Sequence, residues 1–263
     1  MPHELQTDIA TKLIGGQYDA TLADSTVIGY TSAQPAGKIE QLGDTFEPAP
    51  QGVADAKDDA QLAEAVQKAM QYLMDNGYLN DILASYGAEN AWRCIRVHNS
   101  SNSGLKPAPI GRHIMTISKA HALIVLAAAA ALPLTACADP TSSGSSTSGS
   151  DSSTAAATTA SYDVSKIPTV DEIAALVPDD VKERGTLRNG ASADYAPAEF
   201  LGDDSQTPQG YDVDINKALA KVMGLNEGTT NHAEFPTIIP ALGTKFDVGI
   251  SSFTITSERE EQA

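Results

Sequence analysis

The sequence predicts an α/β protein whose regular structure lies on either side of a disordered middle. Short apolar runs of strand length alternate with longer runs of helical apolar spacing before residue 88, and again after residue 162. Between these parts lie an apolar stretch of signal-like character and a tract dominated by Ser and Thr. The 263 residues suffice for one ordinary hydrophobic core or two small ones.

The clearest helix follows Asp58 and Asp59, whose charges suit the N-terminal end of a helix dipole. Its apolar positions form one stripe, made of Leu62, Ala65, Val66, Ala69, Met70 and Leu73. Asp75-Asn76-Gly77 ends it, and Tyr78–Tyr86 makes a short helix. In the same part we expect helices at 3–15 and 26–33, strands at 18–23, 38–42 and 52–56, and an extended crossing at 46–51.

The part after residue 162 shows a similar alternation. Thr169 and Glu172 have the spacing of a capping box, which predicts a helix at 169–176. A longer helix that ends at Met223 turns Ile215, Leu219 and Val222 inward. We also expect helices at 178–184 and 236–242, and strands at 186–189, 229–234 and 246–251.

Charge and cysteine content exclude several classes of function. With 17 Lys+Arg against 34 Asp+Glu, the net charge is -17, which argues against a nucleic-acid partner. The segment 93–119 is the exception, because it carries five basic residues and no Asp or Glu. Cys94 and Cys137 are the only cysteines, so no disulfide framework and no Cys-based metal site is expected. No cofactor is predicted.

The stretch Met115–Cys137 has the features of a lipoprotein signal sequence. Lys119 gives it a positive entry, and the apolar run 122–134 has the length of a signal core. The last four residues, Leu-Thr-Ala-Cys, resemble a bacterial lipobox, which makes Cys137 the candidate lipidation site. A buried Ala-rich helix is one alternative. A membrane-spanning helix is another, although Pro133 would kink it.

Because such a signal works only at an N-terminus, its position suggests that two coding pieces have been joined. Residues 88–114 show no periodicity and are interpreted as an unstructured spacer between genes, or alternatively as an interdomain linker. Residues 138–162 are predicted to be a disordered tether. If Met115 serves as an N-terminus, the expected location is the extracellular face of the cell membrane, with a lipid anchor.

Both outer parts resemble extracellular solute-binding proteins of the polar amino-acid ABC-transporter family. In the first part, residues 1–87, the resemblance rests on the return segment GDTFEPAPQGVADAK and the ending AEAVQKAMQYLMDNGYLNDILASYG, and on Gly16, Asp19, Ala20 and Asp24. In the second part, residues 163–263, it rests on RGTLRNGASADYAPAEF, GYDVDINKALAKVMG and AEFPTIIPALGTKFDVGISSFTITSERE. The first part resembles the back of a family member and the second part its front.

The resemblance implies a type II periplasmic-binding-protein-like fold in permuted order. Its first lobe would be nearly complete, assembled from about 46–87 and 186–255, and its second lobe only partial. The implied function is the substrate-binding component of an ABC importer, with an amino acid as ligand and a permease as partner. Two alternatives stay open: a non-functional joined fragment of two binding-protein genes, and a dehydratase-like enzyme on the same fold. The interpretation is of a binding protein, because His232 and Glu234 form no evident acid–base pair.

An amino-acid zwitterion needs a cation for its carboxylate and an anion for its ammonium group. The resemblance assigns the cation to Arg259, whose planar guanidinium can hold a carboxylate through two parallel bonds, and the anion to Asp24. An exposed arginine paired with Glu258 or Glu260, and a helix cap, are the respective alternatives. The remaining implied ligand contacts are Tyr195, Phe235, Ser251, Ser252 and Thr254.

Ser192 bears on which amino acid is bound. Relatives with cationic ligands often carry an acid at the matching position. The serine therefore favours a neutral polar or acidic amino acid as the ligand.

Overall fold

The computed structural model describes residues 6–33, 39–43, 49–88 and 161–263. The predicted signal with its lipidation site, the spacer before it, and the Ser/Thr tract up to residue 160 lie outside these residues. So do residues 46–48, the first half of the expected extended crossing at 46–51. At Gln6 and Thr7 the description covers the backbone alone.

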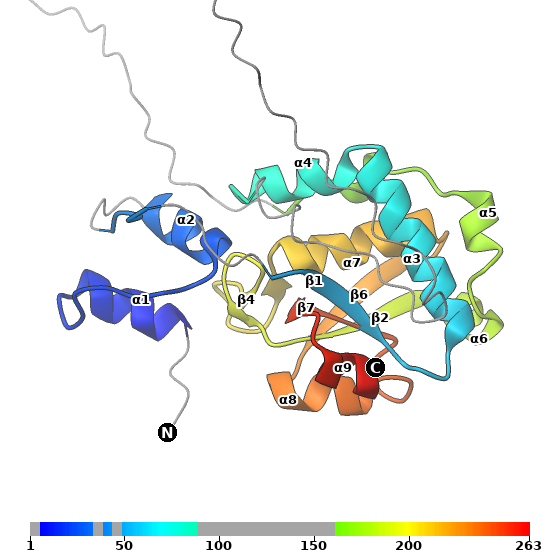
Figure 1. Ribbon diagram of the computed structural model, residues 1–263. Helices are drawn as coiled ribbons and strands as arrows, with labels where there is room; N and C mark the ends of the chain where they lie inside the picture. The colour runs from blue at the N-terminus through cyan, green and yellow to red at the C-terminus, as the bar shows by residue number, and fades with distance from the viewer. Residues whose placement is uncertain (1–5, 34–38, 44–48, 89–160) are drawn as a thin grey trace, which may run out of the picture. The chain divides into compact units, whose positions relative to one another are not determined.

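A four-stranded sheet joins the two outer parts of the sequence. Its order is β1 (Gln51–Asp55), β7 (Val248–Thr254), β2 (Thr186–Ala191) and β6 (Glu227–His232). The strand β2 pairs in parallel with both β6 and β7, whereas β1 pairs antiparallel with β7 through Gln51–Thr254 and Asp55–Val248. One edge strand therefore comes from the first part and three strands come from the second, and β1 lies beside β7 in Figure 1.

Three helices cover one face of this sheet: α3 (Ala60–Asp75), α4 (Tyr78–Ser85) and α7 (Tyr211–Val222). The predicted stripe of α3 is buried at each of its six positions. It packs against α7, where Ile215, Leu219 and Val222 are buried as predicted, and α3 and α7 share one core with β2 and β7. Burial of this apolar surface is the main force that holds the two parts together.

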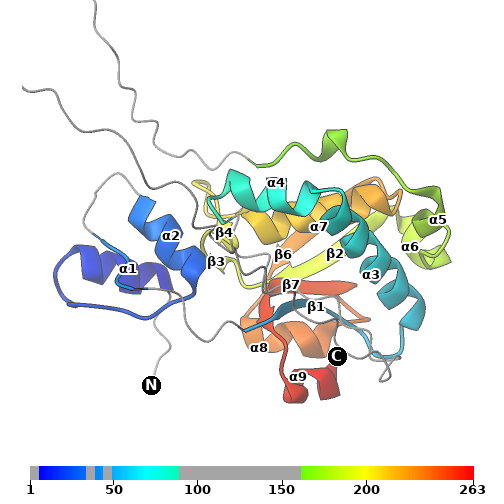
Figure 2. The ribbon, with the colours of Figure 1, turned by 45° about the horizontal axis from the view of Figure 1, so that its top comes forward.

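The opposite face carries smaller elements, α8 (Phe235–Ile238), the 3-10 turn Ile239–Ala241 and α9 (Ser257–Gln262) (Figure 2). Ile238, Phe246 and Phe253 form a second buried cluster there. The close contact at Gly190 shows how tightly this layer packs, because a Cβ atom would come 2.5 Å from the ring of Phe246. Residues 236–242, expected as one helix, divide between α8 and the 3-10 turn.

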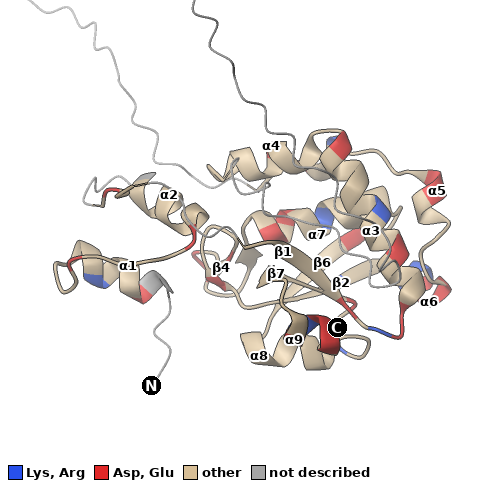
Figure 3. Ribbon diagram, viewed as in Figure 1, with Lys and Arg blue, Asp and Glu red and all other residues tan. Residues whose placement is uncertain are grey.

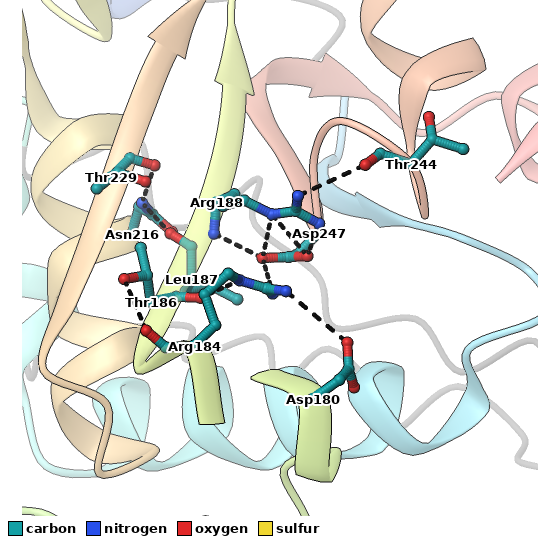
Figure 4. A network of polar contacts seen from close by, with 9 residues as sticks. All are labelled: Asp180, Arg184, Thr186, Leu187, Arg188, Asn216, Thr229, Thr244 and Asp247. Carbon is teal, nitrogen blue, oxygen red and sulfur yellow. Dashed lines mark hydrogen bonds and ion pairs between the residues drawn. The ribbon is translucent and has the colours of Figure 1, made fainter. Parts of the chain in front are cut away.

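A buried aspartate, Asp247, holds the N-terminal half of β2 in place. Asp247 accepts hydrogen bonds from the backbone N–H of Arg188 at 2.8 Å and from its Nη2 at 2.6 Å. Arg184, at the end of α6 (Asp179–Arg184), donates to it from Nη2 at 2.8 Å. Figure 4 shows both guanidinium groups directed at this carboxylate, with the exposed Asp180 at the rim. The hydrogen bond to Asp247 is the largest of the effects that raise the pKa of Arg188.

Four further elements of the second part differ from expectation. The predicted capping box is wrong, because Thr169 donates to the carbonyl of Lys221 instead, and α5 is shortened to Asp171–Ala174 with Val170 before it. Three short strands were not predicted: β3 (Asp194–Tyr195), β4 (Glu199–Leu201) and β5 (Pro208–Gln209), which form a small antiparallel sheet. Runs of two or three residues are too short to show an alternating pattern.

The beginning of the chain retains its predicted helices but not its strands. The helices α1 (Gln6–Ile14) and α2 (Ser25–Ala33) are confirmed within the described residues. Residues 18–23 and 39–42 form no strand, so the predictions of strands at 18–23 and 38–42 are wrong for every described position. A strand needs a neighbour to complete its hydrogen-bond ladder, and neither segment finds one in the described part of the chain.

Candidate functional site

The candidate site is centred on Arg259, which lies in α9 and contacts the end of β7. Its Nη1 donates a 2.8 Å hydrogen bond to the carbonyl of Thr254, which turns the side chain back towards the strand. The guanidinium carbon lies 5.3 Å from the ring centroid of Phe235 and 5.5 Å from that of Phe253. These two rings are themselves stacked at 4.7 Å. Cation–π attraction therefore holds the charged plane beside an aromatic pair.

The local sequence explains how Arg259 reaches this position. Thr256 caps α9, because its Oγ1 accepts a 3.3 Å hydrogen bond from the backbone N–H of Arg259. The helix therefore begins directly after the strand and returns the arginine to it. Beyond the bond to Thr254, the guanidinium meets no hydrogen-bond acceptor in the described part of the chain. Most of its five N–H donors are available to an anion such as a carboxylate.

Ser251 and Ser252 are engaged within the protein. Ser251 Oγ accepts from the backbone N–H of Ser192 at 3.0 Å and donates to Glu199 Oε1 at 2.7 Å. Ser252 donates to Asp212 Oδ2 from its N–H at 2.7 Å and from its Oγ at 3.2 Å. Ser252 also has a φ of 48°, a conformation that is uncommon for a residue with a side chain. Both serines thus depend on buried acids for their positions.

These two acids, Glu199 in β4 and Asp212 in α7, were not predicted. They are 2% and 5% exposed, and they lie within hydrogen-bonding reach of each other. Burial, and then the charge of Asp212, raises the pKa of Glu199 well above its usual value. Burial also raises the pKa of Asp212. The only sequence signal was the presence of acids inside otherwise apolar runs, Glu199 in PAEF and Asp212 in GYDVD.

Tyr195 and Asp24 meet across 171 positions of sequence. The Tyr195 hydroxyl donates a 2.9 Å hydrogen bond to Asp24 Oδ2. Burial, followed by the charge of Asp24, raises the pKa of this phenol. Asp24 also precedes α2, where its backbone carbonyl accepts from Ile28. The structure therefore joins one predicted aromatic contact to the predicted partner of the ammonium group.

The seven predicted ligand contacts fall into three groups. Arg259, Phe235 and Thr254 are connected by direct contacts, and Phe253 joins them as a residue that sequence reasoning missed. Ser251 and Ser252 follow each other on β7 and share the acid pair. Tyr195 and Asp24 form the third group.

A cavity of about 620 Å³ adjoins Arg259. Strand β1, helix α3 and the end of β7 contribute to its wall, so it is built by both parts of the sequence. Its lining includes Asp55, Lys57, Glu64, Lys68, Thr254 and Arg259. Of the seven predicted contacts, Thr254 and Arg259 line it.

Ser192 and His232, which were also considered from the sequence, both make hydrogen bonds within the protein. Ser192 is buried, and its hydroxyl donates to Asp194 Oδ1 at 3.2 Å. His232 Nδ1 accepts from the backbone N–H of Ala193 at 3.0 Å, so it plays a structural part. Within the described ranges no group of His, Cys, Asp and Glu side chains could hold a metal ion. No helix in those ranges is long and apolar enough to cross a membrane.

Comparison with known proteins bears on the second part of the chain. Residues 187–263 match the family described as bacterial extracellular solute-binding proteins, family 3. The matched range includes β2, α7, β7 and Arg259. It supports the family resemblance for that part, whereas the resemblance of residues 1–87 and the joining of two pieces stay predictions.

Similar proteins bind amino acids. The arginine-binding protein ArgT of Corynebacterium glutamicum is 40% identical over 94 residues, which are 35% of this chain and 30% of that protein. The ABC transporter arginine-binding protein 1 of Escherichia coli is 43% identical over 74 residues, which are 28% of this chain and 30% of that protein. A solved ancestral cationic amino-acid solute-binding protein is 44% identical over 32% of this chain and 36% of that chain, with a TM-score of 0.30.

The chain spans about a third of the length of the curated relatives it matches. The predicted fold class, α/β and type II periplasmic-binding-protein-like, is confirmed by the family match and the mixed sheet. The permuted order of the lobes stays a prediction. So do the division at residues 87, 114, 137 and 162, the lipid anchor and the location.

Proposed function

We propose that this chain is the substrate-binding component of an ABC importer, and that it captures an amino acid at the carboxyl end of β7 for delivery to a permease. The observation that carries the proposal is the state of Arg259. Its guanidinium is fixed by Thr254 and the rings of Phe235 and Phe253, yet most of its donors face no acceptor among the described residues. A preorganised cation of this kind suits the α-carboxylate of an amino acid.

The pair of Tyr195 and Asp24 supplies the opposite charge. Asp24 is exposed, and within the described ranges its side chain accepts one hydrogen bond, from the Tyr195 hydroxyl. A carboxylate has about four lone-pair positions, so capacity for an ammonium group is left. The hydroxyl of Thr254 makes no hydrogen bond with the described residues and is a third polar group for the ligand.

Two features point to different ligand side chains. By resemblance, Ser192 favours a neutral polar or acidic amino acid. However, Ser192 holds the carboxylate of Asp194, which lies two residues away and would attract a cationic side chain. Two of the similar proteins are named as arginine-binding. L-glutamine, L-glutamate and L-arginine therefore form the test set.

Calorimetric titration of the full chain with these three amino acids tests the proposal. We expect saturable binding of at least one, weakened about a hundredfold by Arg259→Ala, because charge-assisted hydrogen bonds to the carboxylate are lost. Arg259→Lys keeps the charge but lacks the planar fork, so it should bind with intermediate affinity. Lys182→Ala, at an exposed position of α6, is the control that should bind normally. Unchanged affinity in Arg259→Ala would contradict the assignment of Arg259.

The membrane part of the proposal rests on Cys137. If this cysteine carries a lipid, Cys137→Ser should move the protein from the membrane fraction to the soluble fraction, with amino-acid binding unaffected. Protein that stays in the membrane fraction after the substitution would contradict the lipid anchor. The competing interpretation, a joined fragment without function, predicts no binding of any of the three amino acids.

A further inference from the structure

The acids Glu199 and Asp212 lie in the interior with no cation to balance them. Their residues are 2% and 5% exposed, and neither forms an ion pair with Lys, Arg or His in the described part of the chain. Glu199 accepts a hydrogen bond from the hydroxyl of Ser251, and it is near enough to the acids Asp212 and Asp194 and to the phenols of Tyr195 and Tyr211 to interact with them electrostatically. Two adjacent buried carboxylates cannot both stay ionised in such surroundings, since each charge is desolvated and repelled by the other.

The contacts indicate which acid holds the proton. Asp212 Oδ2 accepts two hydrogen bonds from Ser252, and Asp212 lies in the first turn of the 12-residue α7, where the helix dipole favours negative charge. Glu199 Oε1 accepts one hydrogen bond, from Ser251. Its buried Oε2 has no hydrogen-bond partner among the described residues, and the carboxyl group of Asp212 lies within hydrogen-bonding reach of the Glu199 side chain. That contact is satisfied when Oε2 carries a proton and donates it to Asp212.

We propose that Glu199 and Asp212 form a one-proton acid pair that positions Ser251 and Ser252 at the ligand end of β7. This inference rests on the proposed function for the meaning of the site, although the pair itself can be tested without a ligand. The pair connects β4 and α7 to two consecutive residues of β7. It also holds Ser252 at its uncommon φ of 48°. Without the pair, Ser252 would relax to an ordinary strand conformation.

Loss of the shared proton would place two negative charges side by side in the interior. The pair would then separate or take up water, and Ser251 and Ser252 would lose their supports. Glu199→Gln mimics the protonated acid, since its amide can donate to Asp212 while its carbonyl accepts from Ser251. Glu199→Ala removes both contacts. Comparison of the two variants therefore separates the effect of the shared proton from the effect of losing the side-chain contacts.

The experiment is a pH titration of the full chain, with Glu side-chain carboxyl groups labelled with carbon-13 and backbone amides labelled with nitrogen-15. We expect one Glu carboxyl resonance, absent in Glu199→Gln, to stay in its protonated position at neutral pH while those of exposed glutamates have titrated. The Ser252 amide should shift when Glu199 titrates in the parent and stay constant in Glu199→Gln. A Glu199 resonance that titrates with the exposed glutamates overturns the proposal. An amide of Ser252 that does not respond to Glu199 overturns the positioning role.

Binding gives a second readout that separates this inference from the proposed function. With L-arginine, L-glutamine and L-glutamate as probes, Glu199→Gln should keep the parent affinity at neutral pH. Glu199→Ala should weaken it about tenfold or more because two supports of the strand are lost. As the pH rises through the titration of Glu199, affinity should fall in the parent and hold in Glu199→Gln. If none of the probes binds the parent, the proposed function fails, and the labelled spectra still decide on the acid pair. Equal affinity in the parent and in Glu199→Ala overturns the positioning role.

Discussion

The hydroxyl of Tyr86 donates a 2.7 Å hydrogen bond to Asp214 Oδ2, and the two residues are 128 positions apart. Asp214 is buried and also accepts from Ser161 Oγ at 2.6 Å, from the backbone N–H of Tyr162 at 2.6 Å and from Lys217 Nζ at 2.8 Å. One carboxylate thus ties α4, the segment that enters the second part, and α7 together. It therefore joins the two outer parts of the sequence.

Tyr86→Phe tests this junction. We expect the free energy of unfolding to fall by about 1–2 kcal/mol, because a buried hydrogen bond to a charged acceptor is lost while the ring stays in place. Chemical denaturation monitored by circular dichroism measures the change. Tyr72→Phe is the matched control, since the hydroxyl of Tyr72 makes no hydrogen bond within the described ranges. An equal loss in both variants would show that Tyr86 and Asp214 do not connect the parts in solution.

Asp247→Asn should be more costly. Asp247 is 6% exposed and holds both Arg184 and Arg188. Among the described residues, its neutralisation leaves the partly buried Arg188 without a charge partner and Arg184 with the exposed Asp180 alone, which should lower the free energy of unfolding by about 2–4 kcal/mol. Asp180→Asn, at the exposed rim of the same network in Figure 4, should change it by less than about 0.5 kcal/mol. Similar small effects in both variants would mean that the network contributes little.

Gly228 marks a close approach between β6 and α7. A Cβ atom there would lie 2.5 Å from the carbonyl oxygen of Asn216, and a backbone atom in a helix cannot move aside easily. Gly228→Ala should therefore lower the free energy of unfolding by about 2 kcal/mol or more. In Gly29→Ala the new methyl group meets nothing closer than 4.0 Å, and helix propensity should make that variant neutral or slightly more stable. A thermal melt that ranks the two variants in the opposite order would contradict the packing of β6 on α7.

Asp55 should make stability depend on pH. Burial, and then the charge of Asp59, raises the pKa of Asp55 from 3.8 to about 6. Between these values the folded chain binds the proton more tightly than the unfolded chain, so this contribution to stability is full below about pH 4 and is lost as the pH rises through 6. Asp55→Asn should remove that decline and be more stable at neutral pH, by on the order of 2 kcal/mol.

Denaturation series at several pH values measure the effect of Asp55. Asp58→Asn, in the exposed turn before α3, is the control and should follow the parent at every pH. If Asp55→Asn declines between pH 4 and 6 as steeply as the parent, the carboxylate of Asp55 is not the cause.

Charge patterning gave no further guide to the site. In Figure 3 the acidic positions are spread over several helices, with α3, α5, α6, α7 and α9 each carrying some. The excess of acidic residues therefore argued against nucleic acid but did not indicate where a ligand would bind.

Periodicity predicted the elements that bury a regular face. The stripe of α3 and the inward positions of α7 follow from a 3.6-residue repeat, because each helix packs one face on the sheet. The strands expected at 18–23 and 38–42 were wrong because a strand also depends on a partner elsewhere in the chain. The small sheet β3–β4–β5 was missed for a related reason, since its pairing is set by tertiary contacts and not by its own pattern.

The candidate site, too, was predicted only in part from the sequence. Family resemblance identified Arg259, and the structure places it beside Phe235 and Thr254. It gave no sign that Phe253 joins the aromatic pair, or that Glu199 and Asp212 support Ser251 and Ser252. Buried acids are visible only when the groups that surround them are known, because a single Glu or Asp in a sequence is usually solvated.

We propose that the carboxyl end of β7 binds the carboxylate of an amino acid. The most direct measurement is a nitrogen-15 NMR titration of the full chain with L-arginine, L-glutamine and L-glutamate, each at up to about 1 mM, a concentration that detects even weak binding. We expect shifts at the Arg259 side-chain Nε–H and at the amides of Ser252 and Thr254 with at least one of the three. No shift at these positions with any of them would contradict it.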